Sequence, residues 1–195
     1  RPSDSEKPKR IVMIQCVGSR DPEVNAYCSR YCCMAAMKNA MLIKVEQDPD
    51  ADITILYKDI RAAGKGFEEY YVRAKERYGI KFVKGELIQV SQDSKTNKLR
   101  IEYETPTKQK TMLHSDLVVL SCALVPSKGL RELAGLLGVR VATDGFLKEL
   151  DDKVSSVETD IAGVYVCGVT EGPKDIPESV AQASAAASKA ALRMG

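Results

Sequence analysis

Short apolar stretches alternate along this chain with segments of helical pattern, and this order restricts the fold more than any other feature. Residues 11–17, 52–60 and 80–83 are rich in β-branched or other apolar residues, as expected of strands that are buried on both faces. Between them, residues 28–46 and 66–79 contain strong helix formers or apolar side chains at helical spacing. A β-α-β-α-β order predicts an α/β fold with a doubly wound parallel sheet and right-handed crossovers.

The pattern changes in the middle of the chain. Residues 86–91, 99–104 and 110–114 alternate in character and are separated by polar turns, which predicts a small antiparallel meander. Residues 116–121 are apolar again, so we expect them to return to the parallel sheet. The expected architecture is therefore a doubly wound parallel sheet with an antiparallel meander.

The last third of the chain predicts two helices and one strand. Ser127 is suited to cap a short helix that runs to residue 137. Residues 163–168 form an apolar run that predicts a buried strand. Residues 176–194 are rich in alanine, and we expect a helix there, with Asp175 as its cap and Pro177 in its first turn.

Charge and hydropathy exclude several classes of protein. The 195 residues carry a formal net charge of +2, which gives no strong attraction for nucleic acid or for an acidic membrane. No apolar run approaches the roughly 20 residues of a transmembrane helix, and the polar start does not resemble a secretory signal. The chain begins at Arg1 and not at methionine, so we expect either a processed product or an excised piece of a larger protein.

Four of the six cysteines are clustered within the first 33 residues: Cys16, Cys28, Cys32 and Cys33. The first of them follows a predicted strand, at the edge where a parallel sheet opens its binding crevice. On a helix, Cys28 and Cys32 share a face, whereas Cys33 points about 100° away from Cys32. Ligation of one metal centre by all four thiolates therefore requires a loop or a distorted first helical turn at residues 28–33.

Four thiolates suit either zinc or an iron–sulfur cluster. Zinc sites normally use paired C-x2–4-C knuckles, so the spacing here favours an iron–sulfur cluster. The alternative is that cysteines fill the core as small hydrophobes, which is our expectation for Cys122 and Cys167. Gly18 is the only glycine in the turn that follows the first strand, residues 16–20, so the G-x-G-x-x-G signature of dinucleotide binding is missing.

Four longer stretches resemble the A-type subunit family of heterodisulfide reductase, the flavin- and iron–sulfur-containing proteins of methanogens and other anaerobes. They are IQCVGSRD (14–21), YCSRYCCM (27–34), DIRAAGKGFEEYY (59–71) and GPKDIPESVAQASAAASKA (172–190). The resemblance implies a core similar to thioredoxin reductase that binds FAD, with a 4Fe–4S cluster nearby. It places the cluster ligands at Cys16, Cys28, Cys32 and Cys33.

The resemblance also implies a domain organisation. Residues 1–10 are a polar tail, 11–123 are a nucleotide-binding-like insert domain that carries the cluster cysteines, and 124–195 are the second segment of an FAD-binding domain. The helix that begins near residue 176 then directs its partially positive amino terminus at the flavin. Lys174 could add a charge to the flavin site or could be a solvated surface lysine. The cofactor-binding residues implied are Gly168, Val169, Lys174, Asp175, Ile176 and Pro177. The first FAD segment of the family is absent, so this FAD site is incomplete.

The function that the resemblance implies is electron transfer between FAD and the 4Fe–4S cluster, with flavin-based bifurcation as an extension. Expected partners are the other subunits of a heterodisulfide reductase-type complex and a ferredoxin or hydrogenase-type electron donor, in the cytoplasm. We assign no catalytic residue, and we expect the fragment alone to be inactive as an oxidoreductase. Two alternatives remain open: a redox-inert zinc-binding docking module, and a pyridine-nucleotide-binding dehydrogenase domain.

Overall fold

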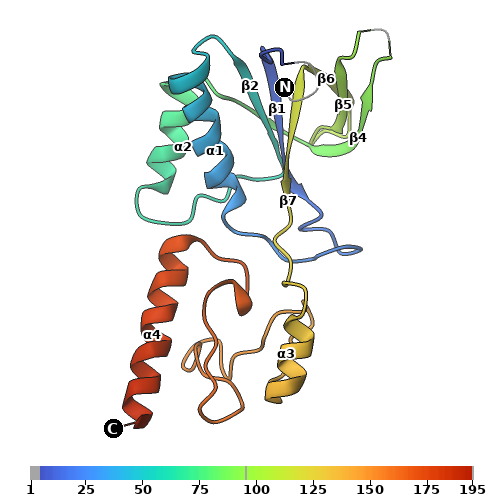
Figure 1. The fold of residues 1–195 in the computed structure, drawn as a ribbon. Coiled ribbons are helices and arrows are strands. Elements are labelled where there is room, and N and C mark those ends of the chain that lie inside the picture. The colour runs from blue at the N-terminus through green and yellow to red at the C-terminus, as the bar shows by residue number, and fades with distance from the viewer. Residues whose placement is uncertain (1–4, 95, 195) are drawn as a thin grey trace. The chain divides into compact units, whose positions relative to one another are not determined.

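The chain divides into two compact units in the computed structural model, which describes residues 5–94 and 96–194 (Figure 1). Unit 1 consists of Arg1–Gly18 and Cys32–Cys122. Unit 2 consists of Ser19–Tyr31 and Ala123–Gly195. A short segment from the amino-terminal part thus belongs to the unit that is formed mainly by the carboxyl-terminal part, which the sequence pattern does not indicate.

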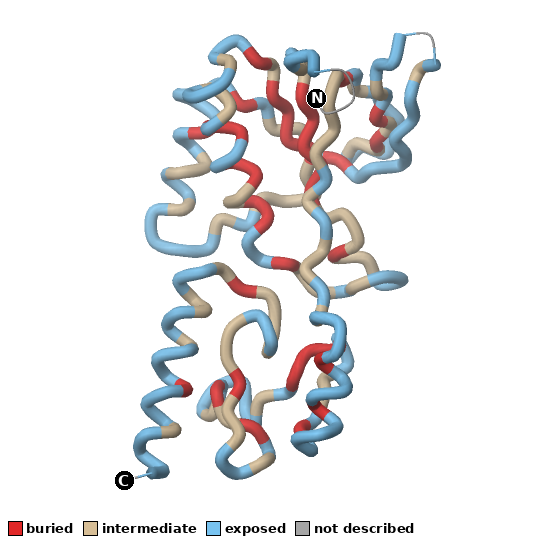
Figure 2. Tube along the Cα trace, in the orientation of Figure 1, coloured by how far each residue is buried: buried red, intermediate tan, exposed pale blue. Residues whose placement is uncertain are grey.

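Unit 1 is built on a parallel sheet with the strand order β3-β2-β1-β7, which confirms the predicted α/β fold. Strand β7 returns to the parallel sheet, as predicted, and pairs with β1. Buried apolar side chains extend along the two central strands, β1 and β2 (Figure 2). The strands are β1 (Arg10–Val17), β2 (Asp52–Tyr57), β3 (Lys81–Lys84) and β7 (Leu117–Cys122).

Two helices of unit 1, α1 (Cys32–Leu42) and α2 (Phe67–Glu76), cover one face of this sheet (Figure 1). The residues that follow α1, Ile43–Gln47, form a single π-helical stretch. The core between helices and sheet contains Met13 and Met37, both almost fully buried. Helix α1 begins four residues later than predicted, because the chain before Cys32 turns through a left-handed residue, Arg30, with φ 61°.

The predicted antiparallel meander is present, and it covers the other face of the sheet. Ile101 and Tyr103 of this meander pack against Val12 and Ile14 of β1. Because alternate side chains of a strand point to opposite faces, β1 contributes to both cores. The strands of the meander are β4 (Glu86–Gln92), β5 (Leu99–Glu104) and β6 (Lys110–Ser115).

The start of β1 is held by Asp116, whose carboxylate accepts hydrogen bonds from the backbone amides of Lys9 and Arg10 at 3.0 and 2.8 Å. Burial alone would raise the pKa of Asp116, but the hydrogen bonds from Arg10 and Lys9 outweigh it, so the pKa lies below its ordinary value. The stabilisation from this carboxylate is therefore present above the unfolded-state pKa of about 3.9 and is lost as the pH falls through the lower folded-state value.

We expect the substitution Asp116→Asn to lower the free energy of unfolding at pH 7 by about 1–2 kcal/mol, because it removes a charged acceptor from two backbone amides. Below pH 4 the parent protein loses the same contribution, so the two stability curves should converge. Denaturant unfolding at a series of pH values measures this. Asp152→Asn, an exposed site with the same change of charge, is the control. A parallel offset between the two curves at every pH would contradict the interpretation.

Unit 2 contains α3 (Leu130–Leu137), a single 3-10 turn (Gly168–Thr170) and the long helix α4 (Ile176–Met194). The prediction of α4 was correct. The prediction of Ser127 as the cap of α3 was wrong: Gly129, with φ 87°, occupies the cap position and makes no side-chain cap bond. The carbonyl of Ser127 accepts the Leu130 amide at 3.1 Å, so its backbone, not its side chain, contacts the start of the helix.

Two further predictions for the apolar segments were wrong. Residues 163–168 do not form a strand; within the described chain, Tyr165 makes only an isolated bridge, to Glu158. A strand needs a neighbour over several residues, and the chain around Glu158 offers a single paired position. Cys122 was expected to be buried but is exposed, because it lies at the end of the edge strand β7; Cys167 is half-buried.

Candidate functional site

Cys16 lies at the carboxyl end of β1, where the regular strand geometry breaks. Its φ is 62°, in the left-handed region, and the pairing of β1 with β7 shifts register between Ile14 and Val17. A non-glycine residue in this conformation is strained, and such strain is concentrated at functional sites. The half-buried thiol of Cys16 is therefore placed by a bulge at the edge of the sheet where ligands bind to α/β proteins.

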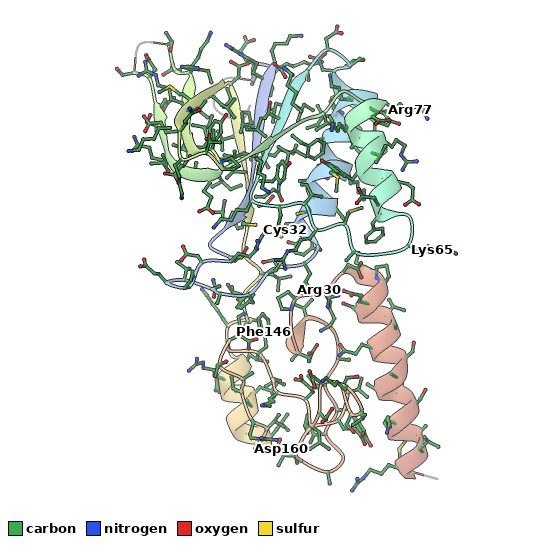
Figure 3. The ribbon with its side chains drawn as sticks, turned by 180° about the vertical axis from the view of Figure 1, so that it is seen from behind. Arg30, Cys32, Lys65, Arg77, Phe146 and Asp160 are labelled. Carbon is green, nitrogen blue, oxygen red and sulfur yellow. The ribbon has the colours of Figure 1, made fainter. Side chains whose placement is uncertain are left out.

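Cys32 and Cys33 are the first two residues of α1, and both are buried. Figure 3 shows Cys32 at the end of α1 that lies level with the carboxyl end of β1. Cys33 packs in the core cluster that also contains Met13 and Met37. In this structure Cys33 therefore behaves as a small core residue, whereas Cys32 lies at the margin of the core.

Cys28 belongs to the segment Ser19–Tyr31 of unit 2, and both of its neighbours are anchored there. The Tyr27 hydroxyl donates to the Leu124 carbonyl at 2.9 Å, and the Tyr27 ring meets the edge of Phe146 at a centroid distance of 5.6 Å. The fully buried Ser29 hydroxyl accepts the Leu124 amide at 2.9 Å. Cys28 itself is half-buried, so its sulfur is held on a fixed but accessible loop.

The sulfur of Cys28 already accepts a hydrogen bond. The backbone amide of Arg30 donates to Cys28 Sγ at 3.3 Å. Amide donors of this kind stabilise a thiolate. The guanidinium of Arg30 in turn forms an ion pair with Glu178 of α4, within the same unit.

The ligand set as a whole stays a prediction. In the part of the chain that the structure describes, no group of three or more His, Cys, Asp or Glu side chains is gathered closely enough to hold a metal ion. Cys16, Cys32 and Cys33 belong to unit 1, whereas Cys28 belongs to unit 2. Helix α1 begins only at Cys32, so Cys28 lies on a loop, whereas Cys32 and Cys33 are consecutive residues of the helix. The loop or distorted turn that four-thiolate ligation requires is therefore present at Cys28 but not at Cys32 and Cys33.

The start of α4 is capped reciprocally. The Asp175 carboxylate accepts the Glu178 amide at 2.8 Å, and the Glu178 carboxylate accepts the Asp175 amide at 3.1 Å. This is a capping box, and it confirms Asp175 as the cap. Pro177 lies in the first turn, where a missing amide costs nothing, and Ile176 beside it is 80% exposed.

Lys174 is buried, at 8% exposure, and is not a solvated surface residue. Its ammonium donates to the carbonyls of Gly168 and Gly172 at 2.9 and 3.1 Å and pairs with the Glu171 carboxylate. All three of its donors are therefore used inside the loop. The Gly168 amide donates to Gln182 of α4 at 2.7 Å, so the start of this loop is also bonded to the helix that follows it.

We expect Lys174→Met to lower the free energy of unfolding of unit 2 by about 2 kcal/mol, because it removes the cation that pairs with Glu171 and the donor to two carbonyls, and leaves Glu171 only the amide of Gln182. Thermal or denaturant unfolding measures this. Lys189→Met, which removes an exposed lysine paired with Glu158, is the control and should have a much smaller effect. Equal losses for the two variants would show that the Lys174 contacts do not hold the loop.

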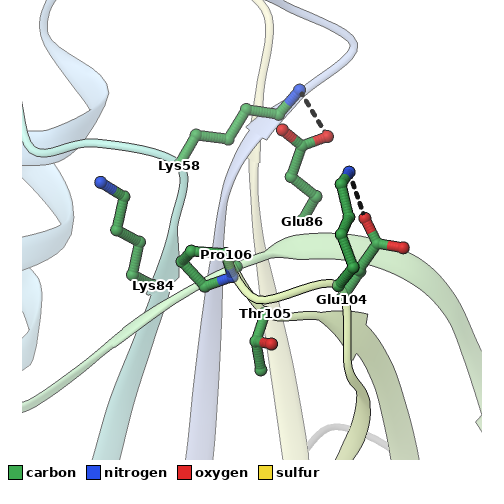
Figure 4. A pocket seen from close by; sticks show the side chains of 8 residues that line it. Lys58, Lys84, Glu86, Glu104, Thr105 and Pro106 are labelled. Carbon is green, nitrogen blue, oxygen red and sulfur yellow. Dashed lines mark hydrogen bonds and ion pairs between the residues drawn. The ribbon is translucent and has the colours of Figure 1, made fainter.

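A shallow cavity of about 160 Å³ lies in unit 1, beyond the carboxyl ends of β2 and β3 (Figure 4). Four of the charged residues that line it form two ion pairs: Lys58 with Glu86 at 3.7 Å, and Lys108 with Glu104 at 2.7 Å. Pockets for drug-sized ligands span roughly 300–1,000 Å³, and a dinucleotide is larger still. This cavity therefore does not support the pyridine-nucleotide alternative.

The fold defines the class of protein. The chain is similar to the thioredoxin reductase of T. acidophilum, with a TM-score of 0.60 and 18% identity over 93% of this chain and 51% of that one. It is also similar to LpdA of Mycobacterium tuberculosis, with a TM-score of 0.54 and 13% identity over 99% of this chain and 36% of that one. The chain thus has a thioredoxin-reductase-like α/β fold, as the resemblance implied. No protein-family model matches it.

Sequence relatives define the family. The chain is 49% identical over its whole length to the A-type subunit of the "H(2)/formate:CoB-CoM heterodisulfide,ferredoxin reductase" of Methanococcus maripaludis. It is 48% identical to a "CoB--CoM heterodisulfide reductase iron-sulfur subunit" of the same type from Methanopyrus kandleri, again over all of this chain. It covers 30% of each of these proteins. The chain belongs to the A-type subunit family of heterodisulfide reductase.

Proposed function

We propose that this chain is the part of an electron-transferring oxidoreductase subunit that holds a 4Fe–4S cluster beside an FAD site. The observation that carries the proposal is the identity of 49%, over the whole chain, to the heterodisulfide reductase relative from Methanococcus maripaludis. The thioredoxin-reductase-like fold supports a flavoprotein, and the Methanopyrus kandleri relative is named an iron–sulfur subunit. The chain spans about a third of these relatives, so the activity of the whole protein is part of the proposal.

The thiols fit the cluster by their chemistry, and Cys28 also fits it by its local setting. Cys16, Cys28, Cys32 and Cys33 would be its ligands. Cysteine thiolates are the usual ligands of such clusters, and the Arg30 amide already donates to one of these sulfurs. A 4Fe–4S cluster supplies one-electron redox chemistry, and the protein sets its potential through burial and hydrogen bonds.

The residues at the start of α4 fit a flavin contact, with one change from the sequence expectation. Gly168, Val169, Asp175, Ile176 and Pro177 would line the flavin, and Lys174 would act by fixing the loop. We infer this role for Lys174 because its donors are bonded to Gly168, Gly172 and Glu171. The exposed Ile176 and Val169 present apolar surface beside the loop, to which an aromatic ring system can bind.

The proposal extends to partners and location. The Methanosarcina acetivorans relative, 46% identical over 95% of this chain and 23% of that protein, belongs by its name to a "Ferredoxin:CoB-CoM heterodisulfide reductase". We therefore propose other subunits of a heterodisulfide reductase-type complex and a ferredoxin or hydrogenase-type donor as partners, in the cytoplasm, with electron bifurcation as the most specific form of the function. Among the described residues, every helix is too short or too polar to cross a membrane.

The test is a metal and flavin analysis of the full-length protein, purified without oxygen. Because other parts of a longer protein can hold metal, the parent is compared with a variant in which all four cysteines are serine. We expect the parent to contain more iron and acid-labile sulfide, in equal amounts, and a visible absorption that dithionite bleaches. A difference in zinc without sulfide would support the docking-module alternative and overturn the proposal. Extraction of FAD from the parent tests the flavin part separately.

A further inference from the structure

One buried polar group in unit 1 has no role in the fold. The side chain of Gln15 is 6% exposed, and neither its amide nitrogen nor its amide oxygen has a hydrogen-bond partner. Among the described residues, the only other buried side-chain atom in this state is the hydroxyl oxygen of Ser115. Burial of an unpartnered amide is costly, because both its donors and its acceptor lose their bonds to water. Such a group requires an explanation.

The position of Gln15 suggests one. Ile11 and Met13 of β1 point to the face that is covered by α1, and strand alternation places Gln15 on the same face. This residue precedes Cys16, at the carboxyl end of the strand. In a parallel β-α unit the helix begins at that same edge, and α1 begins with Cys32 (Figure 3). The unpartnered amide is therefore in unit 1 at the edge that also holds three of the four cysteines.

We propose that the side-chain amide of Gln15 is a positioning residue that donates a hydrogen bond from Nε2 to a sulfur of the cluster. This rests on the proposed function. An N–H group directed at a cluster sulfur stabilises the reduced form, because that form carries more negative charge. Gln15 would thus raise the reduction potential of this cluster. The side-chain amide of Gln15, which has no hydrogen-bond partner in the protein alone, would have a cluster sulfur as its partner.

Ser115 offers a matched control within the same unit. Its hydroxyl is also buried and also lacks a partner, but it lies at the end of β6, and the residue after it bonds to the start of β1. It therefore marks the opposite edge of the sheet from Cys16. Removal of either orphan polar group should relieve a cost in the protein without iron, whereas only Gln15 should influence the cluster.

The experiment compares Gln15→Met and Ser115→Ala in the full-length protein, by redox titration followed by electron paramagnetic resonance. Methionine keeps the length of the side chain and removes the donor. We expect Gln15→Met to make reduction of this cluster about tenfold less favourable, a fall of about 59 mV for a one-electron couple. Ser115→Ala should leave the potential unchanged. An unchanged potential in Gln15→Met, with the cluster present, would overturn the inference and leave the proposed function intact.

A second readout covers the case in which the methionine variant loses the cluster. After removal of iron by a chelator, Gln15→Met should unfold at the same or a higher temperature than the parent, because the orphan amide is gone. A lower unfolding temperature would show that Gln15 makes a structural bond in the protein itself, and would also overturn the inference. If the four-serine variant and the parent contain equal iron and sulfide, the proposed function fails first, whatever Gln15 does.

Discussion

Replacement of Phe146 by alanine is expected to lower the free energy of unfolding of unit 2 by about 3–5 kcal/mol. Phe146 is fully buried, and its ring contacts the Tyr27 ring at 5.6 Å with an interplanar angle of 72°. Loss of the ring removes its transfer free energy and leaves a cavity that the surrounding loops can fill only in part. Aromatic pairs of this geometry contribute a further energy beyond the area that they bury.

The effect should reach Cys28, because Tyr27 precedes it. Without Phe146, the two hydrogen bonds to Leu124 and the ion pair of Arg30 with Glu178 still hold this segment. We expect faster proteolysis within residues 19–31 and a lower iron content in the full-length protein. Burial, with the nearby Asp144 carboxylate, also raises the pKa of the Tyr27 phenol, so the hydroxyl stays a donor throughout the neutral range.

Two further variants separate the effect of the Phe146 side-chain volume from that of the Tyr27 hydrogen bond. Phe146→Leu keeps most of the volume and should cost less than about 1.5 kcal/mol. Tyr27→Phe keeps the ring pair and removes only the bond to Leu124, for a loss of about 1 kcal/mol. Chemical unfolding gives the energies, and limited proteolysis gives the mobility. If Phe146→Ala unfolds unit 2 no more easily than the parent does, Phe146 does not anchor the segment that carries Cys28.

Elements whose pattern is local could be predicted from the sequence. The strands of the parallel sheet are continuous apolar runs, and the meander alternates with a period of two, so each carries its own signal. Helix α4 was predicted with its cap because Asp175 and Pro177 stand at positions with a known role at the start of a helix.

Features that depend on distant partners could not be predicted. The segment of Tyr27 and Ser29 is fixed to unit 2 by bonds to Leu124 that span 97 and 95 residues, and no local pattern encodes them. A lysine is usually exposed on the surface, but the carbonyls of a turn at residues 168–172 accept hydrogen bonds from the Lys174 ammonium. The unpartnered side-chain amide of Gln15 could not be predicted either, because the sequence of an apolar strand does not indicate whether a glutamine in it forms hydrogen bonds.

The four cysteines should respond to substitution as one unit. In the full-length protein we expect each of Cys16→Ser, Cys28→Ser and Cys32→Ser to lose the iron and sulfide of one cluster, since a hydroxyl is a poorer ligand for iron than a thiolate. Cys122→Ser is the matched control, because Cys122 is exposed on an edge strand and is not a proposed ligand. Equal losses from Cys122→Ser would point to general instability of the protein and not to ligation.

Cys33 is the decisive position, because the structure and the family resemblance assign it different roles. It packs in the core with Met13 and Met37, whereas the resemblance makes it the fourth ligand. Cys33→Ala fills nearly the same space without a ligand atom. If Cys33 is only a core residue, the Cys33→Ala variant should keep all of its iron and lose about 1 kcal/mol of stability. If Cys33 is a ligand, the variant should lose the cluster, while the stability of the iron-free protein changes little. We expect the second result. Because Cys32 and Cys33 point about 100° apart on a regular helix, ligation by both requires the first turn of α1 to distort when the cluster binds.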